Sequence, residues 1–206
     1  MPTSLPSGDA TLGLRERKNR DTQRAIVRAA ADLVIEGGYA AATIPRIAER
    51  ADVAPRTVST WFPVKDDILF ERVDENIDRA AQHLRTGPGD VVDRLEAWLT
   101  DEATREQPDP EIARLRNLVV AHDPDLRARA HRLYDQLQGE IATAVARDIK
   151  GSAEDVGPQA FAGATMSFLL AMRAIALERP GSGAGGQMAE GFAFLRAGLA
   201  AITPPD

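Results

Sequence analysis

The sequence predicts an all-α protein, with three helices at the N-terminus followed by a longer helical region. Apolar residues recur at helical spacing along most of the 206-residue chain. The stretches that carry this spacing are separated by glycine and proline, which end helices. Apolar residues make up 44% of the chain, which is enough to bury a core in one or two compact domains.

The first helix is expected to run from about Arg17 or Asp21 to Glu36. Residues 1–14 before it are rich in Pro, Gly and Ser and lack an apolar period, so we expect them to form a flexible tail. A pair of glycines then ends the helix, because glycine readily adopts the backbone conformation that closes a helix C-terminus.

Two short helices joined by a tight turn are expected next, over Thr43–Ala51 and Pro55–Phe62. The Thr43 hydroxyl is expected to cap the first helix by accepting a backbone N–H. Asp52 breaks this helix, and Pro55 starts the second at the position that proline favours. Apolar side chains on both helices are expected to pack together and form a helix-turn-helix. They are Ile44, Ile47, Val53, Val58 and Phe62.

The outward face of the second short helix carries an arginine, three hydroxyls and one large aromatic residue. These side chains can donate to phosphates, bond base edges and contact a thymine methyl group in the major groove of DNA. A solvated surface helix would more often carry Glu and Lys. The alternative interpretation is a helical hairpin within an all-helical core. The outward residues are Arg56, Thr57, Ser59, Thr60 and Trp61.

The formal net charge of −6 is unevenly distributed along the chain. Residues 1–62 contain nine Arg or Lys against seven Asp or Glu, whereas residues 63–206 contain sixteen against twenty-four. Positive charge is densest between Arg15 and Arg28, where only two acidic residues occur. Such a segment can neutralise phosphates, although a merely solvated basic face has the same composition.

Four groups of residues between positions 26 and 65 stand in a characteristic order: Ile26-Val27-x-Ala29-Ala30-x-x-Leu33, Gly38-Tyr39, Thr43-Ile44-x-x-Ile47-Ala48, and Ala51-x-Val53-x-Pro55-Arg56-Thr57-Val58-x-x-x-Phe62-x-x-Lys65. This pattern resembles the TetR family of bacterial transcriptional repressors. The resemblance implies a helix-turn-helix DNA-binding domain over residues 15–64 and a helical ligand-binding and dimerisation domain over residues 65–206. It also implies a ligand-responsive regulator, most often a repressor, that binds a palindromic double-stranded DNA operator as a dimer.

The DNA-binding residues follow from matching the family pattern position by position, together with the basic residues of the first helix. They are Thr43, Arg46, Pro55, Arg56, Thr57, Ser59, Thr60, Trp61, Lys65, Arg17, Lys18 and Arg20. Three positions depart from the pattern. Ala54 stands where Ser or Thr is common, and an alanine cap forgoes about 1 kcal/mol of helix stabilisation. Ser59 replaces a frequent Tyr or Phe, and Pro45 replaces a side chain that touches bases in some relatives. The resemblance therefore implies how the helix docks on DNA, but it does not imply which bases the helix prefers.

Six further helices are expected, at about 65–86, 90–107, 111–121, 125–150, 158–178 and 187–202. The first of them resembles the connecting helix of the family, which transmits inducer binding to the DNA-binding domain. The last two are nearly uncharged over Phe161–Met172 and Gly191–Leu195, so they need cover on two faces. We expect a second copy to supply one cover, giving a homodimer through these two helices, with small residues such as Gly191 allowing close approach.

A ligand pocket is expected in the C-terminal region, although most of its candidate residues could be ordinary core residues. The run A-P-R-T-V-S-T-W-F-P-V-K-D-D is similar to S-P-R-T-F-F-x-Y-F-P-S-K-E-D in an actinobacterial branch of the family, which suggests an acyl-CoA-like effector. The candidate residues are Leu95, Trp98, Leu99, Arg116, Leu118, His122, Tyr134, Met166, Phe168, Leu169 and Arg173.

No motif in the sequence indicates catalysis. Gly181–Gly186 matches the G-x-G-x-x-G pattern of dinucleotide binding, but no strand is expected before it, so we interpret it as a flexible loop. The three histidines are not spaced as metal ligands, and cysteine is absent. The sequence also lacks the G-x-S-x-G motif of a serine nucleophile elbow. We therefore expect no enzyme activity, no cofactor and no metal.

With no apolar run of about 18 residues and no leader, the chain is expected to be cytoplasmic and to avoid membranes. The alternative hypothesis is a helical small-molecule-binding or interaction module without specific DNA binding. Salt-sensitive, sequence-selective binding to DNA would separate the two hypotheses.

Overall fold

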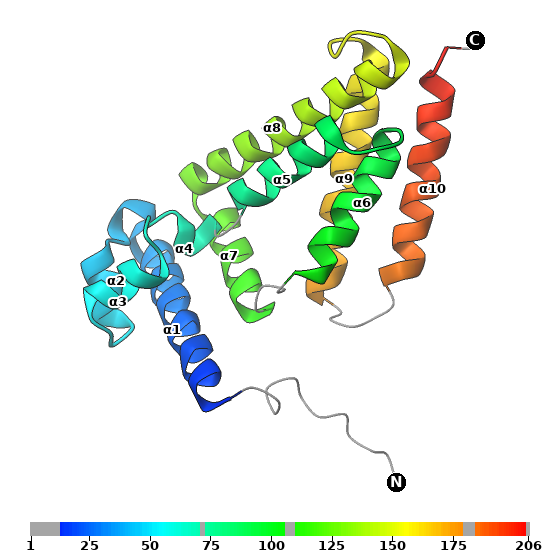
Figure 1. Cartoon of the computed structure of the whole chain (residues 1–206). Helices are drawn as coiled ribbons and strands as arrows, with labels where there is room; N and C mark the ends of the chain where they lie inside the picture. Colours follow the sequence, from blue (N-terminus) through cyan, green and yellow to red (C-terminus); the bar gives the residue numbers. More distant parts are fainter. Residues whose placement is uncertain (1–12, 71–72, 106–109, 179–183, 205–206) are drawn as a thin grey trace. The chain divides into compact units, whose positions relative to one another are not determined.

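The computed structural model describes residues 13–70, 73–105, 110–178 and 184–204, and these residues form ten α-helices, one 3-10 turn and no strand (Figure 1). The all-α class predicted from the sequence is confirmed for them. Two compact units make up the chain: Met1–Glu71 with Glu111–Leu126, and Arg72–Pro110 with Arg127–Asp206. None of the described helices combines the length and apolar character needed to cross a membrane.

The first unit contains the N-terminal helices and one helix from later in the chain. Its elements are α1 (Leu14–Gly37), the 3-10 turn η2 (Tyr39–Ala41), α2 (Ile44–Arg50), α3 (Pro55–Trp61), α4 (Asp67–Phe70) and α7 (Pro110–His122). Helix α1 begins earlier than predicted, because its first turns are rich in Arg, Lys, Glu and Gln, which favour helix without a buried face. The predicted tail, apart from its last two residues, lies outside the described residues.

The turn between α2 and α3 is closed by a backbone hydrogen bond from Val53 N–H to the Ala48 carbonyl, 3.0 Å long. Asp52 within it has a φ of 53°, the left-handed conformation that commonly closes a helix C-terminus. The prediction that Asp52 breaks the helix is therefore confirmed.

The predicted cap of α2 is wrong, since the Thr43 side chain makes no capping hydrogen bond. A capping hydroxyl accepts an N–H from the second or third helical residue, and here the second residue is Pro45, which has none. Helix α3 also lacks a side-chain cap, because its N-cap residue is Ala54.

Helix α7 belongs with the first unit, whereas the sequence analysis placed it in the C-terminal domain. Its buried apolar side chains include Ile112 and Val119, which are seven residues apart and so lie on one face of the helix. Arg116, also buried, donates from Nε to the carbonyl of Ile68 at 2.9 Å. The first unit thus extends to residue 71 and also includes residues 111–126, whereas the boundary of the DNA-binding domain is expected from the sequence after residue 64.

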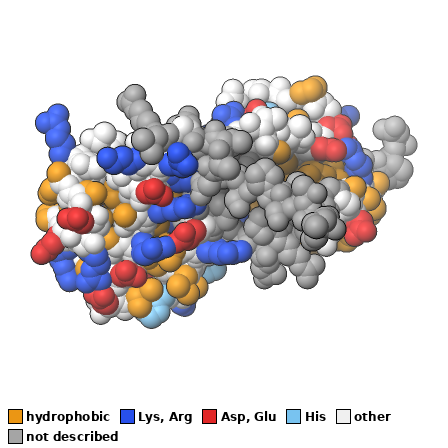
Figure 2. Space-filling model, turned by 90° about the horizontal axis from the view of Figure 1, so that it is seen from below, with side chains coloured by type: hydrophobic (Ala, Val, Ile, Leu, Met, Phe, Trp, Pro, Cys, Tyr) orange, Lys and Arg blue, Asp and Glu red, His pale blue; other side chains and the backbone are white. Residues whose placement is uncertain are grey.

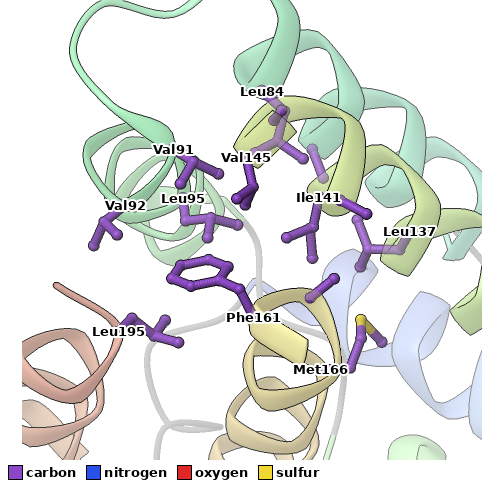
Figure 3. Close-up of a cluster of buried hydrophobic side chains, with 14 of the residues drawn as sticks. Leu84, Val91, Val92, Leu95, Leu137, Ile141, Val145, Phe161, Met166 and Leu195 are labelled. Atoms are coloured by element: carbon purple, nitrogen blue, oxygen red, sulfur yellow. The ribbon is translucent and has the colours of Figure 1, made fainter. Parts of the chain in front are cut away.

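The second unit packs five helices around one apolar core. They are α5 (Val73–Thr86), α6 (Val91–Thr104), most of α8 (Pro124–Ile149), α9 (Val156–Glu178) and α10 (Ala184–Ile202). Figure 3 shows the Phe161 ring of α9 directed into the core, toward Leu95 of α6 and Leu195 of α10. Each of these three side chains is buried. The connecting helix predicted over residues 65–86 is described as α4 and α5, with residues 71–72 between them outside the described part.

Helices α9 and α10 pack closely at Gly191. A Cβ atom added there would lie 2.0 Å from Cε2 of Phe168, so only glycine leaves room for this ring. Phe168 in turn meets Phe192 edge to face, with 5.5 Å between ring centroids. Helix α10 begins three residues before the predicted position, and it includes the last three residues of the glycine-rich segment; the first three lie outside the described residues.

Candidate nucleic-acid interface

Helix α3 is anchored by one face and exposes the other. Val58 and Phe62 are buried beneath it, as the sequence analysis predicted. Arg56, Ser59 and Thr60 are exposed, as is Pro55 at its first position, and Thr57 and Trp61 are half-buried. The helix contains no acidic residue. Its exposed surface therefore combines uncharged side chains with one arginine, and it carries no negative charge that would repel a phosphate backbone.

Some of the polar side chains that are predicted to contact DNA already form hydrogen bonds within the first unit. The Thr60 hydroxyl donates to the Arg56 carbonyl at 2.8 Å, so it offers lone pairs rather than its proton to a base edge. Arg46, exposed on α2, donates from Nη1 to the Ala41 carbonyl at 3.0 Å. Thr43, the N-cap residue of the same helix, is exposed, and its hydroxyl makes no capping hydrogen bond.

Lys65 is held against Tyr39. Its Nζ donates to the Tyr39 carbonyl at 3.1 Å and lies 3.6 Å from the centroid of the Tyr39 ring, a cation–π geometry. The Tyr39 hydroxyl donates to Asp66. Partial burial lowers the pKa of Lys65 below its ordinary value. An ammonium group has three N–H donors, so one bond to a carbonyl leaves donors for a phosphate.

The basic segment of α1 is divided between solvent and an acidic partner. Arg17 and Lys18 are exposed, and Arg20 is half-buried. Arg28 and Arg24 pair with Glu111 of α7, the latter at 4.0 Å. In Figure 2, Lys and Arg side chains are spread over the left part of the face, with acidic side chains among them. Part of the positive charge is thus engaged inside the unit.

A second arginine of the helix-turn-helix is also engaged. Arg50, at the end of α2, pairs through both terminal nitrogens with the Glu36 carboxylate at the end of α1. The hydrogen bond from Arg50 holds the pKa of Glu36 below its ordinary value. This pair braces α2 against α1, so Arg50 serves as a natural contrast to Arg56.

The candidate ligand residues fall into two groups. Arg116, Leu118 and His122 lie on α7 in the first unit, where Arg116 is buried against Ile68 and the other two are exposed. The rest lie in the second unit, where Arg173 is exposed and the others form or border the apolar core. Those core residues are Leu95, Trp98, Leu99, Tyr134, Met166, Phe168 and Leu169.

Two family models match the chain. Residues 26–71 match the model described as bacterial regulatory proteins, tetR family, and residues 90–200 match the model described as MftR C-terminal domain. The chain belongs to the TetR family. The helix-turn-helix of this TetR-family protein, α2 and α3, lies within the N-terminal match, and most of its second unit lies within the C-terminal match.

Individual relatives match over part of their length. The HTH-type transcriptional repressor KstR of Rhodococcus jostii is 30% identical over 105 residues, 49% of this chain and 50% of that protein. The fatty acid metabolism regulator protein of Bacillus subtilis is 26% identical over 125 residues, 61% of this chain and 55% of that protein. The chain thus spans about half the length of these curated relatives. Among solved structures, Salmonella enterica GusR matches with a TM-score of 0.48 and 22% identity, over 88% of this chain and 95% of that one.

Proposed function

We propose that this TetR-family protein is a ligand-responsive transcriptional repressor that binds a palindromic operator as a homodimer. The observation that carries the proposal is the acid-free outward face of α3, which presents Arg56, Ser59 and Thr60 while Val58 and Phe62 anchor it. The relative named as a transcriptional repressor supports the sign of the regulation. Such a protein would act in the cytoplasm, where bacterial DNA lies.

DNA binding is tested first by selecting bound sequences from random duplex DNA and measuring their affinity from about 50 to 200 mM salt. An inverted repeat is expected, with affinity falling steeply as salt rises. Arg56→Ala should then cost about 1 to 3 kcal/mol if the guanidinium contacts a base. Arg50→Ala is the matched control, because Arg50 pairs with Glu36 and is not expected to contact a base, so its operator affinity should fall much less than that of Arg56→Ala. Failure to enrich any sequence would favour a binding module without specific DNA recognition.

The dimer is proposed to form through α9 and α10. On these helices Phe194 is 64% exposed and Leu170 is 41% exposed, and both are large apolar side chains. Phe194→Glu is expected to leave the fold intact and yield monomers by sedimentation. Leu118→Glu, at a side chain of 56% exposure in the first unit, is the control that should stay dimeric. A dimer that survives Phe194→Glu would place the interface elsewhere.

The effector is proposed to be acyl-CoA-like and to bind in the second unit. The aromatic and aliphatic residues around Trp98, Phe168 and Met166 could contact an acyl chain, and Arg173 carries a charge that suits a phosphate. The relative named as a fatty acid metabolism regulator supports this class. Release of the selected DNA by long-chain acyl-CoA, but not by CoA alone, is the expected result. Equal release by both, or by neither, would contradict it.

A further inference from the structure

Asp123 lies at the junction of α7 and α8 and uses its two carboxylate oxygens on different segments. Oδ1 accepts the backbone N–H groups of Asp125 at 2.9 Å and Leu126 at 3.1 Å, which caps α8. Oδ2 accepts the backbone N–H of Tyr39 at 2.8 Å, across 84 positions of sequence. The side chain is only 6% exposed, so solvent does not compete strongly for these bonds.

Tyr39 carries this restraint to Lys65. The backbone N–H of Tyr39 is bound by Asp123, its carbonyl accepts from Lys65, and its hydroxyl donates to Asp66. Its ring also lies under the Lys65 ammonium group. A displacement of the Tyr39 backbone therefore removes both the acceptor and the aromatic face that hold Lys65 in place.

Helix α8 connects the junction with the rest of the chain. Its first three residues belong to the first unit, and the same helix continues to Ile149 in the second. Because Asp123 caps α8 and also accepts from Tyr39, its carboxylate joins the start of this helix to the Tyr39 backbone.

We propose that Asp123 is a positioning residue for DNA binding, which acts through Tyr39 to hold the Lys65 ammonium group where it meets a phosphate. This inference rests on the proposed function, because it needs the protein to bind DNA. It means that the α7–α8 junction affects a phosphate contact through Tyr39 and Lys65, without any contact between Asp123 and DNA.

A double-mutant cycle on the full-length protein tests the inference, with the inverted repeat selected from random duplexes as the ligand. Asn caps helices as well as Asp does, so Asp123→Asn keeps the cap with one oxygen and turns an amide toward Tyr39. Lys65→Met removes the charge and keeps the side-chain length. Each change is expected to weaken binding by about tenfold or less. Added to Lys65→Met, Asp123→Asn should change affinity by less than about twofold.

Salt dependence gives a second readout that a general loss of stability would not change. Each of the two variants should lower the slope of log affinity against log salt by up to about 1 per protomer. Asp90→Asn is the matched control, because Asp90 caps α6 through the same pair of bonds and has no link to Tyr39. Its DNA affinity and salt slope should equal those of the unaltered protein. If Asp123→Asn does not fold, Asp123→Ser caps the helix with its hydroxyl and is too short to reach Tyr39.

The outcomes separate the inference from the function it rests on. If the unaltered protein selects no sequence, the proposed function fails. If it binds, and the effects of Asp123→Asn and Lys65→Met simply multiply, Asp123 acts independently of Lys65 and the inference is overturned. Normal affinity in either single variant overturns it as well.

Discussion

Arg94 and Asp148 form an ion pair between the first turn of α6 and the last turn of α8, in which Arg94 is buried and Asp148 is half-buried. Arg94 Nη2 lies 2.8 Å from Oδ1 and 2.7 Å from Oδ2 of Asp148, and Nη1 donates to the Gly89 carbonyl at 2.7 Å. The Asp148 carboxylate also accepts the backbone N–H of Val91 at 2.7 Å. Arg94 is only 4% exposed, so little water reaches its guanidinium to compensate for the loss of the carboxylate.

Asp148→Ala is therefore expected to lower the free energy of unfolding by about 3 to 5 kcal/mol, because it leaves a buried guanidinium without its partner. Urea unfolding at one fixed protein concentration measures the loss. Replacing both partners, as Arg94→Met with Asp148→Leu, should cost less than Asp148→Ala alone. Asp101→Ala, which breaks the exposed pair with Arg105, is the control and should cost much less. Equal losses for the two single variants would show that burial does not set the strength of the Arg94 pair.

Gly191→Ala is expected to destabilise the second unit by about 1 to 3 kcal/mol, because the new methyl group would overlap the Phe168 ring. Thermal unfolding measures the change. Gly198→Ala is the matched control on the same helix, since a methyl group there would lie 3.9 Å from the nearest side-chain atom, on Phe161. It should be neutral or stabilise by up to about 1 kcal/mol, as alanine favours helix over glycine. A stable Gly191→Ala variant would mean that α9 and α10 can separate at little cost.

Lys150→Gly should raise the free energy of unfolding by about 1 kcal/mol, because Lys150 closes α8 with a φ of 59°, a conformation that costs side chains with a Cβ. Lys150→Ala removes the charge without relieving the backbone and should give no gain. Denaturant unfolding of the two variants separates the effects. Asp52→Gly should stabilise less, since Asp tolerates this conformation better than Lys. A gain from alanine equal to that from glycine would assign the effect to charge.

Arg196 is expected to make the stability of the second unit depend on pH through its exposed ion pair with Asp93. Its hydrogen bond, with a backbone bond from Asp90, holds the pKa of Asp93 below its ordinary value of 3.8. A carboxyl with a lowered pKa in the folded state stabilises the fold above its unfolded pKa, and this contribution is lost as pH falls through the folded pKa. Arg196→Gln should therefore lower the melting temperature at pH 6, with the difference shrinking below about pH 4. A difference independent of pH would mean that Arg196 acts through packing alone.

Local features of the sequence account for most of the fold. Helical periodicity predicted most of the described α-helices to within a few residues of their bounds, although α4 and α5 were expected as one helix. Helix α8 follows Asp123 and begins at Pro124, and a capping carboxylate and a following proline both favour a helix N-terminus. The buried positions of Val58 and Phe62 also followed from spacing alone. These features depend on residues a few positions apart, which is the range that periodicity and capping rules cover.

Features that join distant segments could not be predicted. The bond from Tyr39 N–H to Asp123 and the burial of Arg116 against Ile68 depend on how α7 returns to the N-terminal helices, and no local pattern encodes that return. No pattern in the sequence indicated the hydrogen bonds of Tyr39 to Asp66, Lys65 and Asp123. Because its bond to the Ile68 carbonyl could not be predicted from the sequence, Arg116 was included among the candidate ligand residues. The identity of the DNA-facing residues on α3 stays a prediction.

The interleaving of the two units has a consequence for synthesis. The helix-turn-helix leaves the ribosome early, but α7, which completes its unit, follows only after α5 and α6 have been made. The first unit can therefore be completed only after Leu126 has been synthesised, when α5 and α6 of the second unit have already been made. A chain that terminates at residue 71 would contain α2 and α3 without α7.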